Sequence, residues 1–184
     1  MIITSFDVGV VNMAVSVGVF GKSRQVEYKY AKNIDLRQIR CTSRKCLYER
    51  TDKTAAHRIL HYLEKLHKII KNSDVMLCEL QPLINGLTNV EQALYIYCKQ
   101  RYPHAKVMLI SPNAVYKHFA MSKSKEERIQ QVIDKYAHKI KKLDDSDEPQ
   151  HVCDAINITE YYVDKYVRGT FEKNPFKDFV FSGW

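Results

Sequence analysis

The sequence predicts an α/β fold, in which helices pack on a mixed β-sheet. Three observations predict it: residues 1–35 form consecutive β-rich runs, the hydrophobic spacing becomes helical from about residue 54, and two short apolar runs then alternate with helical segments. Consecutive strands pair antiparallel through tight turns, whereas strands joined through a helix pair in parallel. We therefore expect a five-stranded sheet, with three antiparallel strands followed by parallel ones, in a single domain of residues 1–184.

The first half of the chain carries three strands and a long helix. The strands are expected in residues 1–9, 12–21 and 25–34, and Gly21-Lys22-Ser23 provides the turn between the last two. Residues around 35–53 are polar and basic without a clear period, so we interpret them as a basic excursion from the domain. A helix should follow, because apolar side chains then recur at helical spacing, at Ala55, Ile59, Leu63, Leu66 and Ile70.

The second half alternates strands with helices. DVMLCEL (74–80) and AKVMLI (105–110) are short, continuous apolar runs, typical of strands that are buried on both faces. Helices are expected over 87–100, after Pro112, over about 124–142 and from Pro149 onward, with the acidic loop LDDSDEPQ before the last one. Pro149 suits the first turn of that final helix.

Charge indicates a polyanionic partner. The net charge is +8 and the pI is about 9.2, which favours nucleic acid. No apolar run approaches the roughly 18 residues that a membrane span needs, so we expect no membrane association. The N-terminus has neither the basic and apolar pattern of a signal peptide nor the Arg-rich pattern of a transit peptide.

The five cysteines indicate a reducing environment. Cys78, Cys98 and Cys153 lie in apolar patterns and should be small core residues. Cys41 and Cys46 are spaced as half of a zinc site, but reduced thiols are the default expectation for all five.

Three acidic residues stand out because their neighbours are apolar. Asp7 ends the first strand, Glu79 ends the run DVMLCEL, and Asp154 lies in the last helix three residues after His151, on the same face. Each alone has a structural interpretation, such as a turn cap or a half-exposed helix residue. If the first and fourth strands are neighbours, however, the three carboxylates converge and repel one another, and Mg²⁺ or Mn²⁺ would balance them. Two such ions hydrolyse phosphodiesters, which indicates a metal-dependent nuclease.

These segments resemble a known family. SFDVGVVNMA resembles the first-strand motif of the RuvC-like Holliday junction resolvases, CEL resembles their fourth-strand glutamate motif, and QHVCDAINI resembles their final-helix motif. SPNAVYK is similar to the segment that supplies a lysine in the family. The resemblance spans Asp7 to Asp154, and length and the immediate start at the first strand make it greatest to the poxvirus members. It implies an RNase H-like fold, a homodimer, and Mg²⁺-dependent symmetric nicking of four-way and other branched DNA junctions.

The resemblance also implies residue roles. Asp7, Glu79, His151 and Asp154 match the metal ligands, with Mg²⁺ replaceable by Mn²⁺, two ions per site and no organic cofactor. Many members have Asp at the position of His151, so an acid from Asp144, Asp145 or Asp147 is the alternative there. Lys117 is the first candidate for the phosphate-facing lysine, with Lys123 and Lys125 as substitutes. A poxvirus-like role in recombination, replication and concatemer resolution places the protein in the host cytoplasm.

Further contacts follow from the residues and their order. The basic stretches, including Arg44 and Lys45, are expected to follow phosphates around a junction. The aromatic side chains of Tyr48, Tyr95, Tyr97 and Phe119 either stack on bases or pack in the core. The helix LTNVEQALYIYCKQRY is the candidate dimer interface, because its apolar residues Val90, Leu94, Ile96 and Tyr97 spread too widely for one core-facing stripe.

Three alternatives remain open from the sequence. An RNase H-type nuclease acting on RNA–DNA hybrid or RNA would use the same fold and acids. An actin-like ATPase or sugar-kinase lobe also has an Asp in a first strand such as DVGVVN, although such proteins have two lobes and glycine-rich phosphate loops, and this chain has 6 glycines. A non-catalytic DNA-binding module would use only the basic surface.

Overall fold

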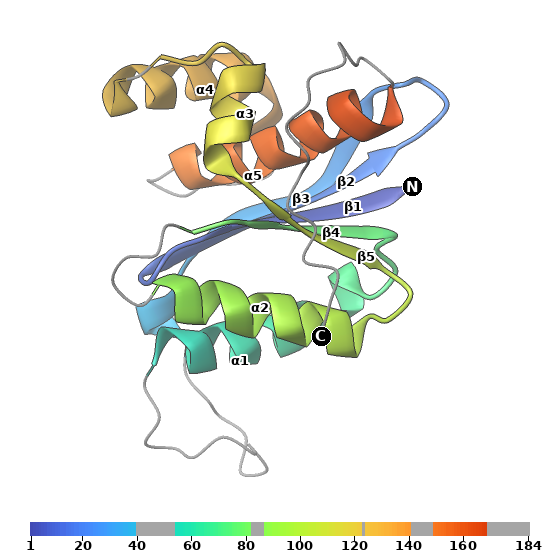
Figure 1. Ribbon diagram of the computed structural model, residues 1–184, viewed down its shortest axis with the longest axis vertical. Coiled ribbons are helices and arrows are strands. Elements are labelled where there is room, and N and C mark those ends of the chain that lie inside the picture. Colours follow the sequence, from blue (N-terminus) through green and yellow to red (C-terminus); the bar gives the residue numbers. More distant parts are fainter. Residues whose placement is uncertain (40–53, 82–86, 123, 141–148, 169–184) are drawn as a thin grey trace.

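The computed structural model describes residues 1–39, 54–81, 87–122, 124–140 and 149–168. A five-stranded sheet lies between two layers of helices (Figure 1). Its strands are β1 (Ile2–Val8), β2 (Asn12–Phe20), β3 (Val26–Asp35), β4 (Val75–Glu79) and β5 (Lys106–Ile110). The helices are α1 (Ala55–Ile70), α2 (Leu87–Arg101), α3 (Pro112–His118), α4 (Lys125–Ile140) and α5 (Pro149–Tyr162), with a short 3-10 helix η1 (Leu36–Gln38) after β3 and a π-helical turn η2 (Val163–Val167) after α5.

The strand order is β3-β2-β1-β4-β5. The first three strands form an antiparallel meander, and β4 pairs in parallel with both β1 and β5. The expected mixed sheet is therefore confirmed. The register between β1 and β4 aligns Phe6 with Cys78, so the carboxyl ends of these two strands lie at the same edge of the sheet.

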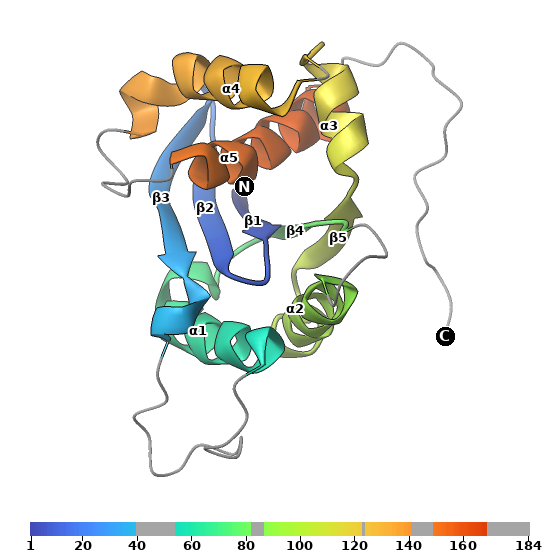
Figure 2. The same cartoon turned by 90° about the vertical axis from the view of Figure 1, so that its left-hand side faces the viewer.

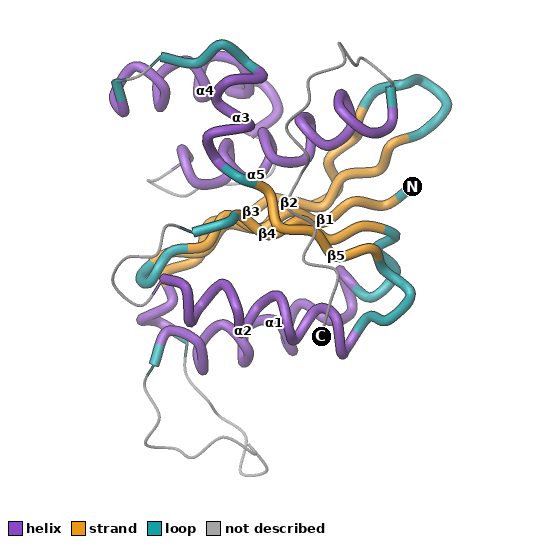
Figure 3. The backbone as a smooth tube through the Cα atoms, viewed as in Figure 1, coloured by secondary structure: helices purple, strands orange, loops and turns teal. Residues whose placement is uncertain are grey.

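Each face of the sheet has its own apolar core because side chains alternate along a strand. Phe6, Met76 and Cys78 face α1 and α2, where they pack with residues such as Leu63. The alternate residues face α5 and α3, where Ile3, Val75, Leu77, Ile110 and Ile158 pack together. Figure 3 shows α1 and α2 on one side of the sheet and α5 on the other, and Figure 2 shows α4 over the outer side of α5.

Helix α5 lies close to the sheet because small side chains separate them. Ser5 Oγ and Thr159 Oγ1 share a hydrogen bond of 2.5 Å, and Ser16 Oγ donates to the carbonyl oxygen of Ala155 at 3.1 Å. All four residues are buried, so these bonds satisfy polar groups that would otherwise be costly. The contacts fix which face of α5 meets β1 and β2.

The predicted elements are all present, with small differences at their ends. The helix expected from residue 54 begins at Ala55, and Thr54 caps it by accepting the His57 N–H at 3.2 Å. The final helix begins at Pro149 as expected. The basic excursion was expected from about residue 35, but Asp35 still belongs to β3 and caps η1. Residues 40–53 lie outside the described part. Among the helices that the structure describes, none has the length and apolar character needed to cross a membrane.

Candidate active site

Two acidic side chains meet at the carboxyl edge of β1 and β4. Asp7 lies two residues after Ser5 and therefore points to the α5 face of the sheet, and Glu79 lies two residues after Leu77 and points to the same face. The register aligns Phe6 with Cys78, so Asp7 and Glu79 follow at the same level on neighbouring strands. Alternation and register together explain why these acids converge.

Helix α5 adds a third acid and an imidazole above that edge. His151 lies in its first turn, and Asp154 follows three residues later on the same side. The side chain of His151 keeps 32% of its surface exposed and that of Asp7 keeps 13%, so the site is partly open to solvent. The four residues predicted from three distant segments therefore lie at one place in the fold.

Hydrogen bonds link these groups directly. His151 Nδ1 lies 3.0 Å from Asp7 Oδ2, and because a carboxylate oxygen only accepts, the imidazole donates from Nδ1. Glu79 shares a hydrogen bond with Asp7, and Glu79 Oε2 accepts from Gln81 Nε2 at 2.8 Å. Asp7 is therefore the central member of the cluster.

The close approach of the acids changes their proton affinity. Burial, the charge of Asp7, the hydrogen bond to Asp7 and the charge of Asp154 raise the pKa of Glu79 to about 10, and the bond from Gln81 opposes this only weakly. Without a cation, Glu79 therefore holds a proton at neutral pH. This response is typical of carboxyl groups that share one site.

The same geometry shows how far the site is from a complete metal centre. Within residues that the structure describes, no three His, Cys, Asp or Glu side chains are already arranged to hold a metal ion. The carboxyl groups of Asp7 and Glu79 share a hydrogen bond. A cation that both groups bind would have to replace that bond.

A hollow of about 160 Å³ opens beside the acids. It is lined by Tyr116, Arg128, Ile129, Gln150, His151 and Asp154. The Arg128 guanidinium lies over the Tyr116 ring, 4.6 Å from its centroid, and Arg128 Nη1 donates to the carbonyl oxygen of Ser122 at 3.1 Å. Burial and the charges of Asp154, Glu79 and Asp7 raise the pKa of Tyr116 to about 12, so its phenol stays protonated.

The sequence did not indicate that Tyr116 and Arg128 line the hollow. Tyr116 directly precedes the predicted Lys117, and Arg128 is one of several cations in SKSKEER, so only the fold distinguishes them. Helical spacing could have indicated Tyr116 as the alternative to Lys117, since adjacent residues of α3 do not point at the same site.

A buried glutamate supports the exit of β4. Glu91, on α2, is 5% exposed, and its Oε2 accepts the backbone N–H of Gln81 at 2.6 Å. Burial raises the pKa of Glu91, while this hydrogen bond opposes the shift. Glu91 therefore positions the backbone of Gln81, and the side chain of Gln81 in turn positions Glu79. The sequence did not indicate this role of Glu91.

Gly9 lets the chain turn sharply after Asp7. Its N–H donates to the carbonyl oxygen of Asn12 at 2.8 Å, and a Cβ at Gly9 would lie 2.9 Å from that oxygen. A side chain at this position would therefore collide with the backbone, so glycine permits the close approach.

The remaining predicted residues either lie away from the hollow or fall outside the described part of the structure. Lys117 is exposed in the last turn of α3, and it does not line the hollow. The other candidate cations and acids fall outside the described residues or side chains: Lys123, Lys125, Arg44, Lys45, Asp144, Asp145 and Asp147, as do Cys41, Cys46 and Tyr48. Their roles stay predictions.

The predicted dimer helix presents two different faces. On α2, Val90, Leu94 and Cys98 are buried in the core, whereas Ile96 is 52% exposed. This division explains the wide spread of apolar residues, and the dimer itself stays a prediction. Cys78, Cys98 and Cys153 are buried free thiols, as expected.

The fold was compared with known proteins. No family model and no curated protein matches the sequence. Solved structures do match the fold. The fowlpox virus Holliday junction resolvase matches with a TM-score of 0.60 and 17% identity, and the alignment covers 90% of this chain and 99% of that one. RuvC of T. thermophilus in complex with a Holliday junction matches with a TM-score of 0.57, 15% identity, and 90% and 97% coverage. The yeast mitochondrial resolvase Ydc2 matches with a TM-score of 0.55, 17% identity, and 87% and 76% coverage.

The chain has the RNase H-like fold of the Holliday junction resolvases. The expected fold class is thereby confirmed. The match to the viral and bacterial structures extends over nearly their full length, so the likeness covers the fold as a whole and is not limited to one motif.

Proposed function

We propose that this protein is a divalent-metal-dependent endonuclease that cuts four-way (Holliday) and other branched DNA junctions. One observation carries the proposal: Asp7 and Glu79, from neighbouring strand ends, share a hydrogen bond close to His151 and Asp154 of α5. A buried set of like charges is costly unless a cation or substrate interaction uses it. The resolvase fold of the neighbours named above supports junction DNA as the substrate.

The donor set fits a hard divalent cation. Carboxylates of Asp7, Glu79 and Asp154 with the imidazole of His151 suit Mg²⁺, with Mn²⁺ as a substitute, and a cation would relieve the repulsion that raises the pKa of Glu79. Two ions per site are proposed. When bound, such ions supply a reactive hydroxide near neutral pH and stabilise the leaving 3′ oxygen.

The chain's own residues have separate tasks. Asp7 orients His151 by accepting its Nδ1–H, and Gln81 orients Glu79. Arg128 provides a cation, and Tyr116 a protonated phenol, on the hollow beside Asp154, where both suit a phosphate. Lys117, one residue beyond Tyr116, remains the proposed second cation along the DNA backbone.

Charge and symmetry support the wider assignment. A net charge of +8 suits a phosphate backbone, and binding should weaken steeply with salt. A two-fold dimer would present two equivalent sites to the two equivalent strands of a junction, which gives symmetric cutting. We propose α2 as its interface and a role in viral DNA recombination, replication and concatemer resolution in the host cytoplasm.

The direct test is Mg²⁺-dependent cutting of a synthetic four-way junction. Parallel reactions contain a linear duplex of the same sequence, an RNA–DNA hybrid, single-stranded RNA and ATP. We expect paired nicks at symmetric positions in the junction, and none without Mg²⁺ or Mn²⁺. Cleavage of only the hybrid would assign an RNase H-type activity, and turnover of only ATP would refute the nuclease proposal.

Three variants test the site itself. Asp7→Asn, Glu79→Gln and Asp154→Asn should each abolish cutting while junction binding stays within about twofold, because each removes a metal-binding charge but no phosphate contact. Asp134→Asn, on the exposed side of α4, is the matched control and should cut normally. Retained cutting in any of the three would exclude that residue from the site.

A further inference from the structure

A group of basic residues lies at the end of the sheet opposite the acidic cluster. Figure 1 shows the start of α5 at one end of the sheet, near the turn between β1 and β2. The other end of that ribbon lies near the N-terminus and the turn between β2 and β3. We call this second region the basic end and define it by five cations: Lys22, Arg24, Lys106, Lys165 and Arg168. The first three are exposed, and the last two are half-buried.

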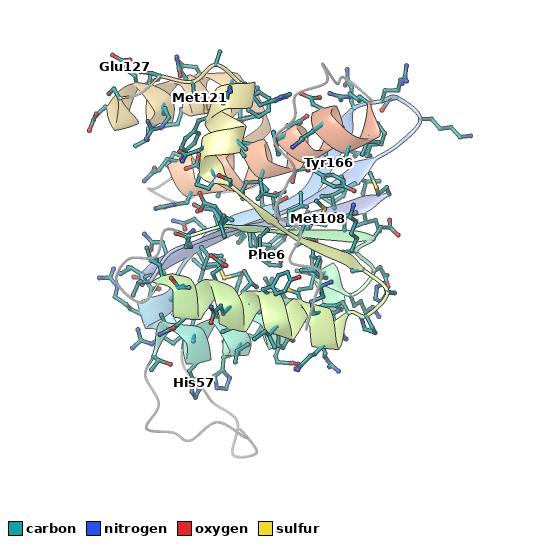
Figure 4. The ribbon with its side chains drawn as sticks, viewed as in Figure 1. Phe6, His57, Met108, Met121, Glu127 and Tyr166 are labelled. Atoms are coloured by element: carbon teal, nitrogen blue, oxygen red, sulfur yellow. The ribbon has the colours of Figure 1, made fainter. Side chains whose placement is uncertain are left out.

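One tyrosine ring holds two of these cations near each other. Tyr166 lies between the end of α5 and β5 (Figure 4). Lys106 Nζ is 5.7 Å and Lys165 Nζ is 5.1 Å from the centre of its ring, so both ammonium groups are attracted to the same aromatic side chain. An anion that binds both groups would offset the repulsion between them. Because the ring orders the two lysines in advance, less conformational entropy is lost when such an anion binds.

The turn between β2 and β3 presents an arginine from an unusual backbone conformation. Arg24 has a φ of 58°, in the left-handed region that residues other than glycine rarely adopt, whereas Gly21 of the same turn does not adopt it. Arg168 stabilises this conformation, because its Nε and Nη2 donate to the carbonyl oxygen of Arg24 at 3.1 and 2.5 Å. The turn therefore keeps a cation where glycine would be less strained, and such strain is often found at functional positions.

The acids at this end do not cancel the positive charge. Asp164 Oδ1 accepts from Arg168 Nη1 at 2.6 Å, and Asp74 Oδ2 accepts a backbone N–H of β1 at 2.6 Å. Glu27, on β3 beside the turn, pairs with Lys29. Among the described residues at this end, cations therefore outnumber acids. This excess favours a polyanionic ligand such as a DNA backbone.

We propose that the basic end is a second DNA-binding surface, which contacts phosphates of a junction arm at a distance from the cut. The proposal rests on the proposed function, because it takes junction DNA as the ligand. At 1.5 Å per residue, the helical path from His151 to Lys165 is roughly 20 Å long. This length corresponds to about six base pairs at 3.4 Å each. An arm that runs along α5 from the acidic cluster therefore reaches the basic end only if it is longer than that.

The test measures the binding of two junctions by the full-length protein in EDTA, using fluorescence anisotropy over a salt series. One junction has arms of about 15 base pairs, and the other has arms of about 4 base pairs closed by hairpin loops, so that only the first can reach the basic end. With long arms, the double variant Lys106→Gln/Lys165→Gln should lower the slope of log affinity against log salt by about 2 and weaken binding about 10-fold at 0.1 M salt. With short arms it should bind like the wild type, within about twofold.

A second variant separates binding from folding. Glycine adopts the left-handed region freely, so Arg24→Gly should unfold at the same temperature as the wild type or at a higher one. It should nevertheless lower the salt slope on the long-arm junction by about 1. The matched control is Lys65→Gln/Lys68→Gln, which removes the same charge from exposed positions of α1, in the other helix layer, and should bind both junctions like the wild type.

The outcomes distinguish this surface from the nuclease itself. An equal loss of affinity in the α1 control, or the same loss with long and short arms, would overturn the proposal. Because binding is measured without metal, the result does not depend on cutting. A wild type that binds with the expected dependence on arm length but does not cut would refute the nuclease alone, and a wild type that cuts while the variants bind normally would refute the basic end alone.

Discussion

The proton on Glu79 predicts an unusual dependence of stability on pH in the metal-free protein. Because the pKa of Glu79 is raised from 4.5 to about 10, the folded chain binds one more proton than the unfolded chain between these values. Stability therefore falls as pH rises through this window, at up to about 1.4 kcal/mol per pH unit. Replacement by Gln, which mimics the protonated acid, should remove that slope.

The expected size is measurable. Between pH 6 and pH 8 the wild type should lose about 3 kcal/mol more than Glu79→Gln. For a domain of this size, this corresponds to a difference in Tm of roughly 6–12 °C. The variant should thus be more stable than the wild type at pH 8 in the absence of metal, although it cannot cut DNA.

Urea unfolding in EDTA at several pH values measures this difference. Glu27→Gln, which removes a carboxyl group with a 72% exposed side chain on β3, is the control and should follow the wild-type slope. Saturating Mg²⁺ should stabilise the wild type more at pH 8 than at pH 6, and should do little for Glu79→Gln. Parallel pH profiles for wild type and Glu79→Gln would refute the reasoning.

Three other changes test the surroundings of the site. Arg128→Gln should weaken junction binding and lower the slope of log affinity against log salt by about 1; gel shifts over a salt series measure this, and an unchanged slope would exclude a phosphate contact. Gly9→Ala should cost about 1–3 kcal/mol in urea unfolding because its Cβ meets a backbone oxygen at 2.9 Å, whereas Gly21→Ala, with open space around it, should be nearly neutral. Glu91→Ala removes the buried acceptor at the exit of β4 and should cost about 1–3 kcal/mol and raise the Mg²⁺ concentration for half-maximal cutting, while an unchanged Mg²⁺ requirement would show that the bond is structural only.

Much of the acidic cluster could be predicted because it depends on simple periodicities. Because side chains alternate along a strand, Asp7 points to the face opposite that of Phe6, and Glu79 points to the face opposite that of Cys78. Helical spacing places His151 beside Asp154. Once β1 and β4 are neighbours, these three local rules suffice to bring the groups together.

The rest of the site depends on contacts between distant elements, which no local rule gives. Arg128 reaches the hollow because α4 packs on α5, and a helix with many cations does not reveal in its sequence which one turns inward. Glu91 could be taken for a surface residue of α2, yet it accepts a backbone N–H from the chain that leaves β4. Such roles follow from tertiary packing alone.

The small side chains between α5 and the sheet have a consequence for how this protein can change over evolution or by engineering. On the α1–α2 side, apolar substitutions that conserve the total volume are tolerated best, which leaves slack for repacking. Between Ser5, Ser16 and Thr159 there is no such slack, and a larger group would lift the helix and tilt the imidazole and acid at its start away from the strand ends. We therefore expect variants that repack one side of the sheet freely to remain active, while even conservative enlargements on the other side leave a folded protein that has lost its chemistry.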